Sequence, residues 1–108
     1  MKVKTIDITA KEWFDRVNGN SYFSAIVIVN FGMKSTKSFS IPFQYGYDSH
    51  YVDIANQELI KENIVKSKRH ENGSYPALWR YCAENNIILR TSKFTNCLKR
   101  EVINFGGA

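Results

Sequence analysis

Residues 13–31 read WFDRVNGNSYFSAIVIVNF, and most of the remaining apolar sequence finds its place against this stretch. From Phe23 to Phe31 every odd position is apolar, which is the period-2 pattern of a β-strand with one buried face. The even positions are polar at the ends but apolar at Ile26 and Ile28, so we expect helices or a second copy of the chain to cover the middle of that face. The stretch therefore predicts a central strand, and it indicates a fold rather than a reaction.

A second strand is predicted after a short loop. Apolar or aromatic side chains at 39, 41, 43 and 45 alternate with Ser, Pro or Gln over 38–45, which indicates one buried face. The loop 32–36 begins with Gly and has about the length that a β-hairpin uses. Pro42 cannot donate a ladder hydrogen bond, so we expect this strand to lie at an edge or to carry a bulge there. An edge strand can recruit a partner chain.

The chain before the central strand is expected to form a strand and then a short helix. Residues 2–9 alternate well enough for a strand. Thr9-Ala10-Lys11-Glu12 then matches a capping box, in which the Thr hydroxyl and the Glu carboxylate satisfy backbone N–H groups at a helix start. This pattern predicts a helix through Val17, which the turn residues Asn18-Gly19-Asn20 would end.

The remaining elements complete an α+β fold. We expect a helix from about residue 51 to 63 after an N-cap at Asp48 or Ser49, a polar loop at 66–73, a helix with Pro76 in its first turn, a short buried strand at 87–90 and a helix at about 94–103. The prediction is a single domain of residues 1–108, with an antiparallel sheet of three or four strands and about four helices.

The formal net charge of +5 belongs mostly to the second half of the chain. Residues 1–54 hold six Lys/Arg against five Asp/Glu, whereas residues 55–108 hold nine against five. Such an asymmetry favours an acidic partner such as nucleic acid, although a solvated, solubilising surface explains the same excess. We assign phosphate contacts or base stacking to eight residues of this half: Lys66, Lys68, Arg69, Trp79, Arg90, Lys93, Lys99 and Arg100.

A second candidate site lies where the helix after residue 49 begins. Tyr47, His50 and Tyr51 crowd this entrance, and a free helix N-terminus suits a phosphate. These residues are therefore predicted as a stacking or anion site. In the alternative interpretation Tyr45 and Tyr51 complete the core, while Tyr47 and His50 are merely exposed.

The sequence contains no recognisable metal, cofactor or catalytic motif. His50, His70, Cys82 and Cys97 lack the close-spaced pairs of zinc modules, and both cysteines suit small core positions. No apolar run approaches the roughly 20 residues that a membrane span needs, so no membrane association is expected. We therefore predict a cytoplasmic protein that is not an enzyme and uses no metal or cofactor.

Two runs resemble a known group of proteins. The run WFDRVNGNSY at 13–22, together with IPFQYGY at 41–47, is similar to a motif shared by small uncharacterised proteins encoded in tailed-bacteriophage genomes. The resemblance implies a phage or prophage origin and a role in the cytoplasm of an infected bacterium. It brings no active site, so no catalytic residue is carried over. The same residues also suit simple packing and turn formation.

Two functions follow as hypotheses. The first is a small non-catalytic phage-type protein that binds nucleic acid or a nucleotide through its basic C-terminal half. The order of elements does not closely match an RNA-recognition, KH, double-stranded-RNA-binding or helix-turn-helix module. The alternative is a protein-interaction module that inhibits a host or anti-phage defence protein by edge-strand pairing, and the same edge would suit a homodimer.

Overall fold

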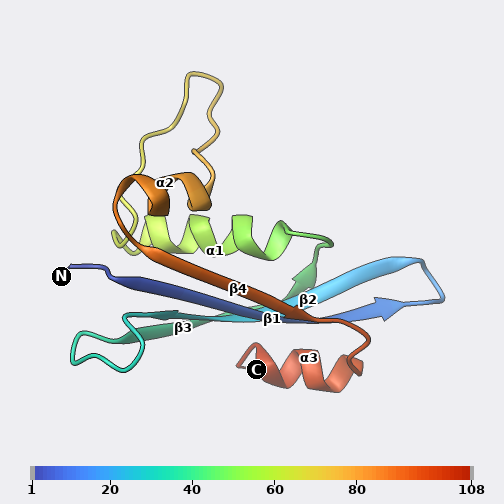
Figure 1. The fold of residues 1–108 in the computed structure, drawn as a ribbon. Helices are drawn as coiled ribbons and strands as arrows, with labels where there is room; N and C mark the ends of the chain where they lie inside the picture. The colour runs from blue at the N-terminus through green and yellow to red at the C-terminus, as the bar shows by residue number, and fades with distance from the viewer. Residues whose placement is uncertain (1, 108) are drawn as a thin grey trace.

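The computed structural model describes residues 2–107, so the two end residues of the predicted 1–108 domain lie outside it. In this range the chain is an α+β domain with four strands and three helices. The elements are β1 (Thr5–Asp15), β2 (Asn20–Val29), β3 (Lys37–Tyr45), α1 (His50–Lys61), α2 (Leu78–Glu84), β4 (Ile88–Phe94) and α3 (Lys99–Phe105). Helices α1 and α2 cover one face of the sheet, and α3 lies across the other (Figure 1). None of the described helices has the length and apolarity that crossing a membrane requires.

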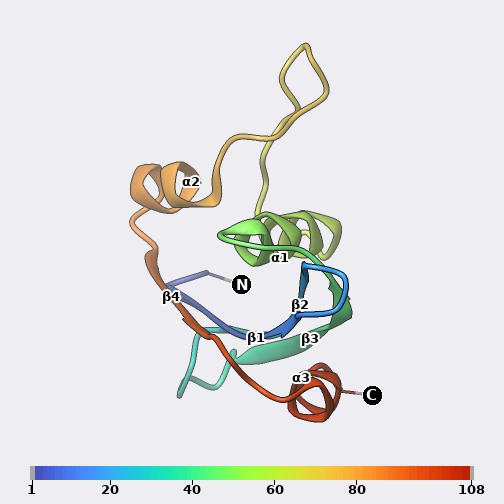
Figure 2. The ribbon, with the colours of Figure 1, turned by 90° about the vertical axis from the view of Figure 1, so that its right-hand side faces the viewer.

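The strands lie in the order β3-β2-β1-β4. The first three pair antiparallel, but β4 runs parallel to β1, so the predicted antiparallel sheet is wrong and the sheet is mixed. The parallel pairing arises because the chain leaves β3 and crosses the sheet through α1 and α2 before it returns as β4 (Figure 2). The prediction of about four helices exceeds the three that the described residues form.

The missing helix is the one expected at 10–17, which instead forms the second half of β1 and its turn. The strand continues to Asp15 and pairs with β2 along its whole length, with Ala10 opposite Ala25 and Trp13 opposite Tyr22. A capping box satisfies only a few backbone groups at a helix start, whereas this ladder pairs backbone groups along both strands. The predicted turn is present, and Gly19 has the positive φ of 70° that its residue type favours.

The core lies between the sheet and α1, and the odd positions of β2 from Phe23 to Val29 face it, as their alternation predicted. Val27 and Val29 are fully buried, and Ala55 and Leu59 of α1 pack in the same cluster. The prediction for Phe31 is wrong, since its side chain is 67% exposed. The reason is that β2 ends at Val29 and the next residue takes a positive φ, which turns the chain away from the sheet.

Strand β3 is an edge strand and carries a bulge, as Pro42 predicted. Ala25 pairs with Ile41 but Phe23 pairs with Gln44, so β3 contains one extra residue at this point. Beyond the bulge the side chains change face. The predicted common face of residues 39–45 is therefore wrong for Phe43 and Tyr45, which lie on the α3 side of the sheet.

Helix α3 packs on the face that the core residues of β2 leave free. The Ser24 hydroxyl donates a hydrogen bond to the Val102 carbonyl, and a Cβ added at Gly106 would come 2.9 Å from the Ser24 Cβ. Ile26 and Ile28 on this face are half-buried. The helix begins later than the predicted 94–103, because β4 extends to Phe94.

Candidate nucleic-acid interface

The segment 62–77 between the first two helices projects from the side of the sheet that α1 and α2 cover (Figures 1 and 2). We call it the α1–α2 connection. Its tip closes as a turn, in which the His70 N–H donates to the Ser74 carbonyl at 2.7 Å and Gly73 takes a φ of 87°. The Asn72 side-chain oxygen accepts hydrogen bonds from the backbone N–H and the hydroxyl of Ser74. The predicted polar loop thus has local hydrogen bonds that shape its tip.

Three cations of the connection are exposed and carry no ion-pair partner. Lys66, Lys68 and Arg69 take part in neither of the two ion pairs that residues 2–107 form. The Nε of Arg69 donates to the Tyr75 hydroxyl at 3.1 Å, and its guanidinium lies 5.2 Å from the centre of that ring. The Lys66 N–H donates to the Tyr81 hydroxyl of α2 at 3.2 Å. None of the three cations is therefore held in an ion pair, and Tyr75 fixes part of the position of the Arg69 guanidinium.

Helix α2, which carries Trp79, follows directly on the connection and lies on the same side of the sheet (Figure 1). Leu78 and Cys82 of this helix face the core, so the helical spacing turns the Trp79 indole outward and leaves it 64% exposed. The guanidinium of Arg80 lies 5.8 Å from the indole centre. An exposed indole with a cation beside it can stack on a base while the cation contacts phosphate.

A cavity of about 730 Å³ separates α1 from the connection. Arg69 and Tyr75 line one side of it, and Asp53 and Asn56 of α1 line the other. The Asn56 amide is buried and donates to the Pro76 carbonyl at 3.2 Å, which ties the end of the connection to α1. Its Oδ1 has no partner among the described residues.

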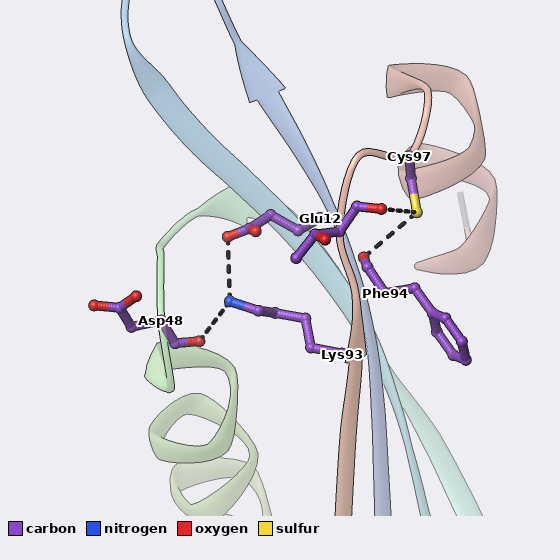
Figure 3. A network of polar contacts seen from close by, with 6 residues as sticks. Glu12, Asp48, Lys93, Phe94 and Cys97 are labelled. Carbon is purple, nitrogen blue, oxygen red and sulfur yellow. Dashed lines mark hydrogen bonds and ion pairs between the residues drawn. The ribbon is translucent and has the colours of Figure 1, made fainter.

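Arg90 and Lys93 are held by the sheet itself. Arg90 makes two hydrogen bonds to the Asp7 carboxylate at 2.6 and 3.0 Å, and this carboxylate raises the pKa of the arginine. Lys93 Nζ lies 3.3 Å from Glu12 Oε1 and 2.9 Å from the Asp48 carbonyl (Figure 3). Both charges already have partners, so these predicted phosphate contacts would have to compete with internal ones.

Lys99 and Arg100 lie on α3, on the opposite face of the sheet from the connection (Figure 1). The Lys99 ammonium is 5.2 Å from the centre of the Trp13 indole. The structure therefore divides the eight predicted residues among three places. It places Lys66, Lys68, Arg69 and Trp79 on the connection and α2, and it separates them from the pair on α3 and from the pair on β4.

The predicted stacking or anion site at the start of α1 is also divided. Tyr47 and His50 are exposed, but Tyr51 is only 8% exposed and belongs to the core, as the alternative interpretation had it. That interpretation is wrong for Tyr45, which is 54% exposed. Ser49 occupies the N-cap position. The surrounding hollow of about 340 Å³ is lined by Asp48 and Asp53 as well, and these carboxylates oppose the approach of a phosphate.

Sequence reasoning missed an aromatic cluster on the α3 face. It consists of Trp13, Tyr22, Phe43 and Tyr45 on the sheet, and Tyr47 beyond the end of β3 contacts the ring of Tyr45. The Tyr22 and Phe43 rings stack with centres 5.2 Å apart. Pairing across the β1–β2 turn was the available signal, because strands joined at 16–19 place Trp13 opposite Tyr22. The bulge of β3, which moves Phe43 to this face, had no signal beyond Pro42.

Known proteins offer no guide to the site. No protein-family model, curated protein or solved structure matches this chain. Among residues 2–107 no cluster of His, Cys, Asp and Glu could hold a metal ion. Burial raises the pKa of the Cys82 thiol to about 11, so this sulfur stays protonated at neutral pH.

Proposed function

We propose that this protein is a small non-catalytic protein of phage origin that binds single-stranded nucleic acid through the α1–α2 connection and α2. One observation carries the proposal: α2, with the exposed indole of Trp79, follows directly on the α1–α2 connection, whose cations Lys66, Lys68 and Arg69 form no ion pair within residues 2–107. The proposal narrows the basic C-terminal half to the α1–α2 connection and α2.

A single strand fits this surface better than a duplex. An indole stacks on a base only if the base face is accessible, which is the case in unpaired strands. Lysines and arginines that neutralise phosphates release counterions, so affinity falls as the salt concentration rises. With Arg80 the surface offers four cations, and log affinity should fall with log salt at a slope of roughly −3, at about 0.7 per phosphate of a single strand.

The test is the fluorescence anisotropy of a labelled oligothymidine over a salt series. Replacing Lys66, Lys68 and Arg69 together by Ala should flatten the slope by roughly two units, since three phosphate contacts are removed. Trp79→Ala should weaken binding by about 1–3 kcal/mol at every salt concentration, because stacking does not depend on counterion release. The matched control replaces Lys99 and Arg100 by Ala on the opposite face and should leave the slope unchanged. A parent protein without affinity at low salt would remove the proposal.

The aromatic cluster favours a second candidate function. Tyr45 and Tyr47 are exposed at the margin of a cluster of five aromatic rings, and aromatic side chains are enriched where proteins bind each other. A role as an inhibitor of a host or anti-phage defence protein would use this surface. It predicts no nucleic-acid affinity, and it predicts that Tyr45→Ala with Tyr47→Ala abolishes inhibition while Trp79→Ala does not.

A further inference from the structure

The two edges of the sheet are protected to different degrees. β3 carries Pro42, a bulge and the exposed Lys37, all of which discourage pairing with another chain. β4 is seven residues long, contains no proline and pairs with β1 without a register shift. Cationic side chains on an edge strand normally discourage pairing with another chain. In β4 the two cations, Arg90 and Lys93, instead form ion pairs with Asp7 and Glu12 of β1. The edge of β4 is therefore less protected against strand pairing than that of β3, and it forms the margin of the sheet in Figure 2.

The backbone of β4 has a defined outward pattern. The Ile88 N–H donates to the Lys4 carbonyl on the β1 side at 3.0 Å. Because strand backbone groups alternate in direction, residues 89, 91 and 93 present their N–H and C=O groups outward. Thr91 is the middle residue of the strand and of this outward set. On the α3 face, Ile88 and Phe94 at the two ends of β4 are 59% and 57% exposed.

We propose that β4 pairs antiparallel with β4 of a second copy of this chain, about a two-fold axis that passes beside Thr91. In this register Thr91 faces Thr91 of the second copy, and the outward groups of residues 89 and 93 meet each other. Ile88 of each copy lies opposite Phe94 of the other, so the two exposed apolar side chains cover each other. Arg90 lies opposite a serine, Ser92, and no like charges meet.

The neighbouring registers of this antiparallel pair are less favourable. We therefore expect the second copy of the chain to pair with β4 in this one register. Centring the pair on Arg90 would leave Phe94 beyond the start of the partner strand, and centring it on Ser92 would leave Ile88 beyond its end. A two-fold pair uses the same edge on both copies and closes on itself. Since β3 is protected, the assembly stops at a dimer with one continuous sheet. This inference does not depend on nucleic-acid binding.

Sedimentation velocity over a dilution series tests the dimer, with an expected mass of twice 12.5 kDa. Thr91→Pro removes an outward N–H and no hydrogen bond to β1, so it should give a folded monomer. Thr91→Lys and Thr91→Glu should each be monomeric because like charges meet at the axis, and a mixture of the two variants should form a heterodimer. Ser38→Lys on β3 is the matched control and should remain dimeric.

Three results would overturn the inference. One is a parent protein that is monomeric at every concentration. Another is a Thr91→Lys variant that dimerises as strongly as the parent, which would place the interface elsewhere. The third is a mixture of the Thr91→Lys and Thr91→Glu variants that stays monomeric, which would exclude the proposed register.

Discussion

Replacing Asn30 should destabilise the protein severely, although this residue lies outside the apolar core. Its side chain is fully buried just beyond β2, and its backbone has a φ of 55°. Oδ1 accepts a hydrogen bond from the Lys4 N–H at 2.7 Å. Nδ2 donates to the Lys2 carbonyl at 2.9 Å and to the Ser35 hydroxyl at 3.0 Å. One amide therefore ties the start of the chain to the loop before β3.

The size of the effect follows from these contacts. A net contribution of about 0.5–1.5 kcal/mol per hydrogen bond gives about 3 kcal/mol for the three short bonds, which Asn30→Gly and Asn30→Ala both lose. The left-handed backbone adds about 1 kcal/mol for alanine but not for glycine. We expect losses of about 3 kcal/mol for glycine and about 4 kcal/mol for alanine, out of a total of about 5–15 kcal/mol for a small domain.

Urea unfolding followed by circular dichroism measures both differences. Asn86 is the matched control, since it has a φ of 57° but is exposed and makes no side-chain hydrogen bond within residues 2–107. Asn86→Gly should be close to neutral, while Asn86→Ala should cost about 1 kcal/mol. The reasoning fails if Asn30→Gly lies within 1 kcal/mol of the parent by this measurement, or if Asn30→Ala is as stable as Asn30→Gly.

Further predictions concern burial and ionisation. Val27→Asp would place a carboxylate at a fully buried position at a cost of several kcal/mol, so no cooperative melting transition should remain. Burial raises the pKa of Cys82 from 9.0 to about 11, so the stability that the buried thiol contributes is complete below pH 9 and is lost as the pH rises towards 11. In urea unfolding at a series of pH values, Cys82→Ala should remove this part of the loss of unfolding free energy at alkaline pH, and Cys97→Ala should not remove it. A hydrogen bond from Asn18 lowers the pKa of Asp15, so Asn18→Ala should raise that pKa in a carboxyl NMR titration.

The sequence predicted β2 well because its alternation is a local property. The odd positions from Phe23 to Val29 are buried as expected. The second half of β1 was mispredicted because Thr9 to Glu12 fits a capping box as well as a strand, and only pairing with β2 decides between them. The parallel direction of β4 had no local signal at all, since its partner β1 lies at the other end of the chain.

The site was predictable in part for the same reason. The exposure of Trp79 follows from helical spacing to Leu78 and Cys82, which is local. The pairing of Arg90 with Asp7 joins residues 83 positions apart, and that of Lys93 with Glu12 joins residues 81 positions apart. Charge counting cannot distinguish such compensated cations from free ones. The aromatic cluster depends on the extra residue in β3, which changes the face of every side chain after it.

The most direct measurement is the emission of Trp79 during titration with nucleic acid. The chain contains two tryptophans, so Trp13→Phe leaves Trp79 as the only indole. Adding an unlabelled oligothymidine at low salt should quench its emission in a saturable manner, because a stacked base lies against the ring. Added salt should reverse the quenching, as expected for binding that depends on phosphate contacts. Emission that stays unchanged throughout the titration at low salt would contradict nucleic-acid binding at this surface.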